Sequence, residues 1–125
     1  MIRSATDLAA TYGTPLYVYD AAIIRRRLRT LVDGIGYEHL GVYYSCKANA
    51  ALGVVRLLLD EGANLDAGSP GDLAGARRVG FRGTGGSSLG VSASDPDLDA
   101  VVAAGAFFTA DSFSQIERYA QRCPA

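Results

Sequence analysis

From residue 41 onward, short apolar runs alternate with amphipathic helical segments. The expected strands begin near residues 41, 63, 87 and 106, and such alternation predicts parallel strands joined by right-handed helical crossovers. Two α/β architectures fit this pattern, a (β/α)₈ barrel of the TIM type and an open doubly wound sheet. A complete barrel needs about 250 residues. A chain of 125 residues with four such units would therefore supply the first half of one.

Helix start signals follow the expected strands. Ser69-Pro70 with Asp72 three residues after the cap predicts one helix, and Asp111-Ser112 with Gln115 predicts the last one. Residues 1–40 form a lead-in of a different kind, with a helix from Ser4, a strand over residues 14–20 and a second helix that begins after Asp20. That second helix carries an apolar stripe at helical spacing, which consists of Ile24, Leu28, Leu31 and Ile35.

Composition excludes several classes of protein. With 49% hydrophobic residues, 20% charged residues and a net charge of −1, the composition is that of a globular protein. It lacks the excess of positive charge that is typical of nucleic-acid-binding proteins. No apolar run approaches the roughly 20 residues of a membrane span. The N-terminus lacks the apolar centre of a signal peptide, and Cys46 and Cys123 have no metal-ligand spacing. Together these features predict a cytoplasmic protein without a metal site.

Polar side chains are expected where strands end and helices begin, which is where functional groups gather in both architectures. Lys47 is the only lysine and follows the first expected strand. A lysine desolvated there is a nucleophile suited to imine chemistry. We expect Asp66 and Asp111 on neighbouring strand ends, where they either pair with Lys47 or cap the following helices. Ser69 and residues 90–92 fall at the same edge.

Other candidate features favour structural roles. The glycine-rich stretch at residues 83–88 precedes a strand instead of following one, which predicts a connection and not a phosphate loop. Strand alternation turns Cys46 away from Lys47 and predicts a buried small side chain. His39 lies before the first strand and is expected at the surface. The arginines between residues 25 and 29 suit a solvated helix face or an anion site.

Four collinear segments, at residues 14–20, 44–49, 65–73 and 110–118, carry a further signal. Together they resemble the fold-type III pyridoxal phosphate-dependent decarboxylases, and are most like the diaminopimelate decarboxylases. Tyr44–Asn49 is similar to their Tyr-x-x-Lys-Ala-Asn segment, and residues 14–20 resemble their opening. Leu65–Leu73 is similar to their Asp-x-x-Ser-x-Gly-Glu-Leu segment, and Ala110–Arg118 fits their fourth unit. The resemblance extends over nearly the whole chain.

The resemblance implies that Lys47 binds pyridoxal 5'-phosphate covalently and that Asp66 tunes the cofactor site. It places Ser69, Asp72 and Asp111 on the rim. The implied reaction is the decarboxylation of an amino acid, meso-diaminopimelate to L-lysine, by a homodimer. Alternatives are an ornithine or arginine decarboxylase of the same family, a non-catalytic truncated chain, and a small open α/β binding domain.

The same resemblance divides the chain into a lead-in at residues 1–40 and the first half of a pyridoxal phosphate-binding barrel at residues 41–125. The family's second half-barrel and C-terminal β-domain are expected beyond Ala125, so the isolated chain is expected to be inactive. The family usually has Glu where this chain has Asp72, which shortens the reach of the carboxylate. The sequence after Asn49 departs from that of alanine racemases, so the racemase branch is disfavoured.

Overall fold

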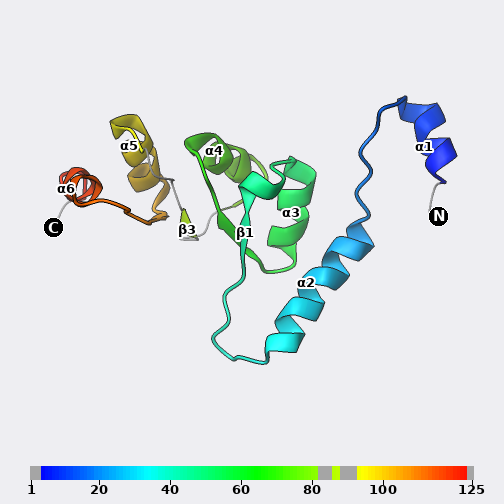
Figure 1. The fold of residues 1–125 in the computed structure, drawn as a ribbon, viewed down its shortest axis with the longest axis horizontal. Coiled ribbons are helices and arrows are strands. Elements are labelled where there is room, and N and C mark those ends of the chain that lie inside the picture. Colours follow the sequence, from blue (N-terminus) through cyan, green and yellow to red (C-terminus); the bar gives the residue numbers. More distant parts are fainter. Residues whose placement is uncertain (1–3, 82–85, 88–92, 124–125) are drawn as a thin grey trace.

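A computed structural model describes residues 4–81, 86–87 and 93–123. Helices and short strands alternate along the described chain (Figure 1). The elements are, in order, α1 (Ala5–Tyr12), α2 (Ala21–Ile35), β1 (Tyr43–Ser45), the 3₁₀ turn η1 (Cys46–Ala48), α3 (Leu52–Asp60), β2 (Asn64–Asp66), α4 (Pro70–Arg78), β3 (Gly86–Ser87), α5 (Asp95–Ala104), β4 (Phe107–Phe108) and α6 (Phe113–Ala120).

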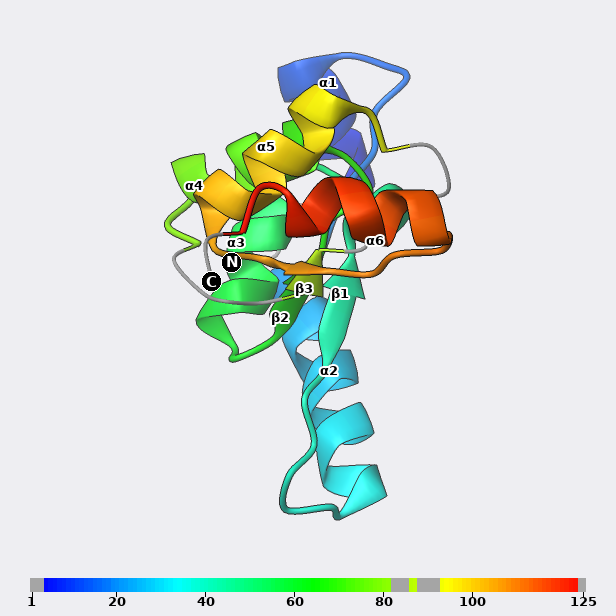
Figure 2. The same ribbon diagram turned by 90° about the vertical axis from the view of Figure 1, so that its left-hand side faces the viewer.

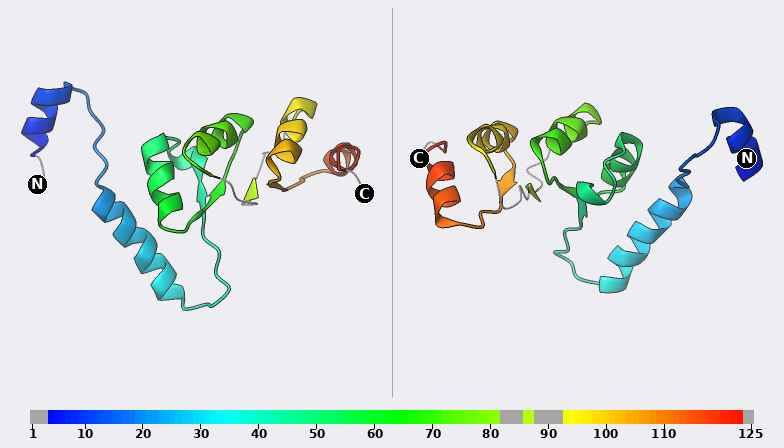
Figure 3. Two further views of the ribbon diagram at one scale, coloured as in Figure 1. Left: turned by 180° about the vertical axis from the view of Figure 1, so that it is seen from behind. Right: turned by 45° about the horizontal axis from the view of Figure 1, so that its top comes forward.

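The strands follow one another in space in the same order as in the sequence. β1 pairs in parallel with β2, β3 pairs in parallel with β4, and β2 lies beside β3. Helices α3 to α6 lie on one side of the strands, each against the next (Figures 1 and 3). A doubly wound sheet reverses its strand order at a switch point, and the described strands show no reversal. The arrangement is that of an arc of a barrel, and this arc is not closed.

The predicted helix starts are confirmed at α4 and α6. The Ser69 hydroxyl accepts a hydrogen bond of 3.2 Å from the backbone N–H of Asp72, and Pro70 occupies the first helical position. The Ser112 hydroxyl accepts a bond of 3.3 Å from the backbone N–H of Gln115. These caps satisfy N–H groups that have no partner within the helix, and they fix where each helix begins after its strand.

The core fills the space between the strands and helices α3 to α6. Leu65, Leu98 and Val101 are its largest fully buried side chains. The main cluster consists of Cys46, Val55, Leu65, Ala67, Leu73, Ala76, Ala93, Leu98, Val101 and Ala106. A smaller cluster of Leu28, Leu58 and Ala63 lies under α2. The helices therefore pack on one face of the strands and leave the opposite face of the arc open.

The apolar stripe of α2 is only partly buried. Leu28 is buried and Ile24 packs beside it, whereas Leu31 is 50% exposed and Ile35 is 51% exposed. Figure 2 shows the C-terminal half of α2 extending away from the other helices. Helical spacing predicted which residues share a face, but among the described elements α2 packs on α3 through part of its length only.

The arginines of α2 do not form a purely solvated face. Nε of Arg25 and Nη2 of Arg29 lie 2.9 Å and 2.6 Å from the two carboxylate oxygens of Glu61. Glu61 follows α3, so these ion pairs attach α2 to the next unit of the fold. Two of the arginines are therefore committed to a carboxylate of the chain itself.

The predicted strand at residues 14–20 is wrong. These residues are extended and carry no strand pairing, and Tyr17 and Val18 are 86% and 59% exposed. β-branched and aromatic composition favours a strand, but a strand forms only against a hydrogen-bonded partner, and none of the described strands pairs with this segment. The segment connects α1 to α2 (Figure 1).

Of the third expected strand the structure describes Gly86 and Ser87, which form β3. Residues 88–92, with the candidate site positions 90–92, lie outside the described residues, as do residues 82–85 of the glycine-rich stretch. Over the ranges that the structure describes, no helix combines the length and apolarity that crossing a bilayer requires.

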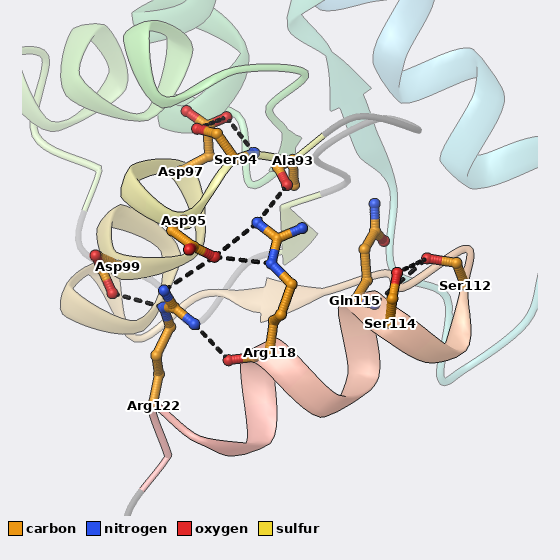
Figure 4. Close-up of polar contacts among 10 residues, drawn as sticks. All are labelled: Ala93, Ser94, Asp95, Asp97, Asp99, Ser112, Ser114, Gln115, Arg118 and Arg122. Atoms are coloured by element: carbon orange, nitrogen blue, oxygen red, sulfur yellow. Dashed lines mark hydrogen bonds and ion pairs between the residues drawn. The ribbon is translucent and has the colours of Figure 1, made fainter.

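Helices α5 and α6 are joined by ion pairs at the end of the arc (Figure 4). Asp95 lies 2.7 Å from Arg118 and 3.1 Å from Arg122, and Arg122 lies 2.7 Å from Asp99. Arg118 also donates to the backbone carbonyl of Ala93 at 3.0 Å. Hydrogen bonds from Arg118 hold the pKa of Asp95 below its ordinary value. The network ties the last helix to the preceding unit.

Candidate cofactor site

Lys47 lies in the 3₁₀ turn η1 directly after β1, at the edge where strands end and helices begin. Its position agrees with the prediction. Its environment does not, because the side chain is exposed in the described chain and so lacks the expected desolvation. The reason is that the face of the arc opposite the helices is open. An exposed primary amine at this edge is available to a carbonyl compound.

Asp66 is the last residue of β2 and pairs in register with Ser45 of β1. Leu65 points into the core, whereas Asn64 and Asp66 are half-buried and alternate to the opposite face. The register therefore sets the Asp66 carboxylate beside the strand end from which the Lys47 turn departs. Both residues lie at strand ends, as expected, and a joint role at a cofactor stays a prediction.

Cys46, the residue before Lys47, lies near the carboxylates of Asp66 and Asp72. Its side chain is 2% exposed, which confirms the predicted buried position. Burial, together with the negative charges of Asp72 and Asp66, raises the pKa of the Cys46 thiol to about 11. Both carboxylates must lie close to the thiol to exert this effect. The end of β1, the end of β2 and the start of α4 thus converge around Cys46.

The side chains of Ser69 and Asp72 both accept backbone hydrogen bonds at the start of α4. In addition to the cap described above, Oδ2 of Asp72 accepts a hydrogen bond of 3.1 Å from the backbone N–H of Gly68. These contacts fix the turn between β2 and α4 and direct the Asp72 carboxylate toward its own helix terminus. Their place at the strand-end edge agrees with the expectation, and a role on the rim of a cofactor site stays a prediction.

Asp111 lies apart from this group. It is exposed between β4 and α6, and its backbone N–H donates to Oε1 of the buried Gln115 at 3.0 Å. The expectation that Asp66 and Asp111 lie on neighbouring strands is wrong, because β3 lies between β2 and β4. The helix cap is Ser112, not Asp111.

Two polar contacts around Lys47 were not anticipated. The Tyr44 hydroxyl donates a hydrogen bond of 3.0 Å to the backbone carbonyl of Asn49, and Oδ1 of Asn49 accepts one of 2.9 Å from the backbone N–H of Ala51. Tyr44 was not among the candidate site residues. The hydrogen bond from Ala51 to Asn49 closes a local turn of the kind that an Asn side chain forms with the backbone two residues further on.

Tyr17, Tyr19, Tyr43 and His39 lie at the surface. Tyr17, Tyr19 and Tyr43 are more than 45% exposed, so they are not core residues in this chain. His39 is exposed, as expected, and contacts only the ring of Tyr37 among the aromatic pairs of the described residues, at 5.8 Å.

An apolar groove of about 540 Å³ lies between α2 and β1. Its lining includes Ile23, Leu28 and Leu31 of α2, and it ends at Ser45 and Asn49, next to the lysine turn. Lys47 does not line it. The groove therefore borders the polar site without forming part of it.

The polar groups fit a cofactor that carries an aldehyde. A primary amine can bind an aldehyde carbon covalently, and the resulting nitrogen is cationic when protonated. Carboxylates at Asp66 and Asp72, held near the base of the same turn, stabilise positive charge there. Lys47 is the residue of this group that would hold such a cofactor, and Asp66 is the carboxylate placed nearest in register.

Comparison with known proteins identifies the family. The model of the family described as "Pyridoxal-dependent decarboxylase, pyridoxal binding domain" matches residues 21–125. A diaminopimelate decarboxylase of Methanothermobacter thermautotrophicus is 38% identical over 122 residues, which are 96% of this chain and 28% of that protein. The chain thus spans less than a third of the length of this relative.

Solved structures agree. The diaminopimelate decarboxylase from M. jannaschi matches with a TM-score of 0.84 and 25% identity, over 94% of this chain and 29% of that one. A lysine/ornithine decarboxylase from Vibrio vulnificus, solved with putrescine, shares the fold with a TM-score of 0.81 and 24% identity, over 94% of this chain and 34% of that one. The chain belongs to the pyridoxal-dependent decarboxylases and is the N-terminal part of their pyridoxal-binding domain.

Proposed function

We propose that the protein containing this chain decarboxylates an amino acid, and that its substrate is meso-diaminopimelate and its product L-lysine. The observation that carries the proposal is the placement of the sole lysine at the carboxyl end of β1, with Asp66 in register on the neighbouring strand. The identity to diaminopimelate decarboxylases over nearly the whole chain supports the choice of substrate.

In this proposal Lys47 has two tasks. Its Nζ would hold the aldehyde of pyridoxal phosphate covalently, and when not so bound it could carry a proton. The cofactor, when bound, would supply an acceptor for the electron pair left on the α-carbon by decarboxylation. Nζ of Lys47 is the group that this chain offers at that edge for moving a proton to or from the substrate carbon.

The carboxylates supply the electrostatic part of the site. Asp66 stabilises positive charge near Lys47 and the cofactor, and Asp72 stands behind it at the start of α4. Because Asp72 is bound to the backbone of Gly68, we assign it to the rim and to the shape of the turn, together with Ser69. Asp111, two strands away from Asp66, lies at the outer end of the same rim.

Lys47 being the only lysine allows a direct test. The chain is incubated with pyridoxal 5'-phosphate, reduced with borohydride, digested and measured by mass spectrometry. We expect the pyridoxyl mass on the peptide that contains Lys47, and more of it in the folded chain than in the urea-unfolded chain. Lys47→Arg keeps the charge and removes the reactive amine, so its only remaining site is the N-terminus. Equal modification of folded and unfolded chains would count against the proposal.

Substrate choice is tested on the protein expressed from the whole reading frame that carries this chain. CO₂ release is measured from meso-diaminopimelate, L-ornithine, L-arginine and L-lysine in parallel, with L-lysine formation as the second readout. We expect the first substrate to be preferred. Faster turnover of L-ornithine or L-arginine would assign the protein to the other branch of the family.

We further propose that residues 41–125 are the first half of the barrel, that residues 1–40 lead into it, and that the complete protein is a homodimer. The 125-residue chain alone is expected to lack decarboxylase activity and to associate, because the apolar groove beside β1 and the free strand edges are uncovered. Measurable CO₂ release by the purified chain would contradict this part of the proposal.

A further inference from the structure

The turn that presents Lys47 is short and is fixed from both sides. η1 covers Cys46, Lys47 and Ala48, and a three-residue 3₁₀ turn has weak hydrogen-bond geometry of its own. Its first residue, Cys46, is buried in the main core cluster. Its last residue precedes Asn49, whose backbone carbonyl receives the Tyr44 hydroxyl at 3.0 Å. Lys47 lies between these two attachments.

Tyr44 is well placed to act as the second attachment. Its ring packs against both core clusters, the main one and the one under α2. Its backbone is held in β1, opposite Leu65. Burial raises the pKa of the Tyr44 hydroxyl, so the hydroxyl stays protonated and able to donate at neutral and mildly alkaline pH. The donor is therefore rigid, and the carbonyl that it holds lies on the far side of the turn.

Asn49 in turn restrains the start of α3. Its side chain accepts the backbone N–H of Ala51, the residue that caps α3 without a side-chain hydrogen bond of its own. Tyr44 thus fixes Asn49, and Asn49 fixes the start of α3. Loss of the Tyr44 hydroxyl would release one end of the lysine turn while leaving Cys46 buried at the other.

We propose that Tyr44 is a positioning residue for Lys47, whose hydroxyl holds the Asn49 carbonyl and so fixes the turn that aims the Lys47 amine at the cofactor. The inference rests on the proposed role of Lys47 and goes beyond it, because it assigns a task to a hydroxyl that donates to a backbone carbonyl of the chain itself. The Tyr44 ring supplies packing, and the hydroxyl supplies the position of the amine.

The test compares Tyr44→Phe with Tyr43→Phe. The two substitutions remove the same hydroxyl from adjacent strand residues, and Tyr43 is 47% exposed. Each variant is incubated with pyridoxal 5'-phosphate and trapped with borohydride, and the Lys47 adduct is expressed per folded chain from its urea unfolding curve. We expect Tyr44→Phe to lower the adduct about 3- to 10-fold, the range of one net hydrogen bond, and Tyr43→Phe to leave it unchanged.

Amide hydrogen exchange over residues 46–51 provides a second, cofactor-free readout. Tyr44→Phe should accelerate exchange in this stretch while exchange in α5 stays as in the wild type, and Tyr43→Phe should not. Wild-type adduct levels in Tyr44→Phe, together with unchanged exchange, would overturn the inference. If the wild-type chain forms no more adduct folded than unfolded, the proposed function fails, and hydrogen exchange alone then decides whether Tyr44 fixes the turn.

Discussion

Truncation of Leu65 should separate the role of the core from that of the exposed apolar surface. Leu65 lies in β2 between Asn64 and Asp66 and is 1% exposed. Leu65→Ala removes three buried carbons, worth about 2.4 kcal/mol at about 0.8 kcal/mol each. The cavity left behind adds to this, and we expect a total loss of about 3–4 kcal/mol in the free energy of unfolding. That is a large share of the roughly 5–15 kcal/mol that stabilises an ordinary domain.

Leu31→Ala is the matched control, because it removes the same atoms from a side chain that is 50% exposed. Its expected cost is about 1 kcal/mol or less. Both variants are unfolded in urea and followed by circular dichroism. If Leu65→Ala is already unfolded in buffer, titration with an excluded osmolyte recovers its transition. Equal losses for the two variants would refute the claim that Leu65 belongs to the buried core and Leu31 to the exposed apolar surface.

Three further predictions concern single side chains. Hydrogen bonds from Arg118 lower the pKa of Asp95 in the folded chain. The ionised Asp95 therefore stabilises the fold fully above its unfolded pKa of about 4, and this stabilisation is lost as the pH falls through the lower folded pKa. Asp95→Asn should accordingly weaken the dependence of the melting temperature on pH below pH 4. Cys46, with a pKa of about 11, should resist iodoacetamide at pH 8 until the chain unfolds, whereas the other cysteine reacts, as peptide mass spectrometry would show. Gly36→Ala, at φ +59°, should cost about 1 kcal/mol in urea unfolding, whereas Gly34→Ala, inside α2, should stabilise.

Local signals predicted the units of the fold well. Ser69 and Ser112 mark helix starts because a capping hydroxyl acts over three residues, within reach of sequence patterns. The strand expected at residues 14–20 failed because its composition is favourable but pairing depends on a distant segment. Leu31 shows the same limit, since spacing identifies a helix face but not what covers it.

The site was predicted in part for the same reason. Lys47 and Asp66 lie at the ends of consecutive strands, as chain order predicted, and the register pairs Asp66 with Ser45, two residues before Lys47. Asp111 was placed next to Asp66 although a whole unit separates their strands. The role of the Tyr44 hydroxyl was missed because its acceptor is a backbone carbonyl. Every residue has such a carbonyl, so the residue type at the acceptor position gives no signal.

The sequential packing of the helices has a consequence for synthesis. Each helix from α3 to α6 rests on the one before it, so every new unit finds its docking surface already made when it leaves the ribosome. Contacts between sequence neighbours close short loops and form fast. Folding can therefore proceed vectorially, one unit at a time. The lysine turn, which lies in the first unit, is then assembled before the last helix has been translated.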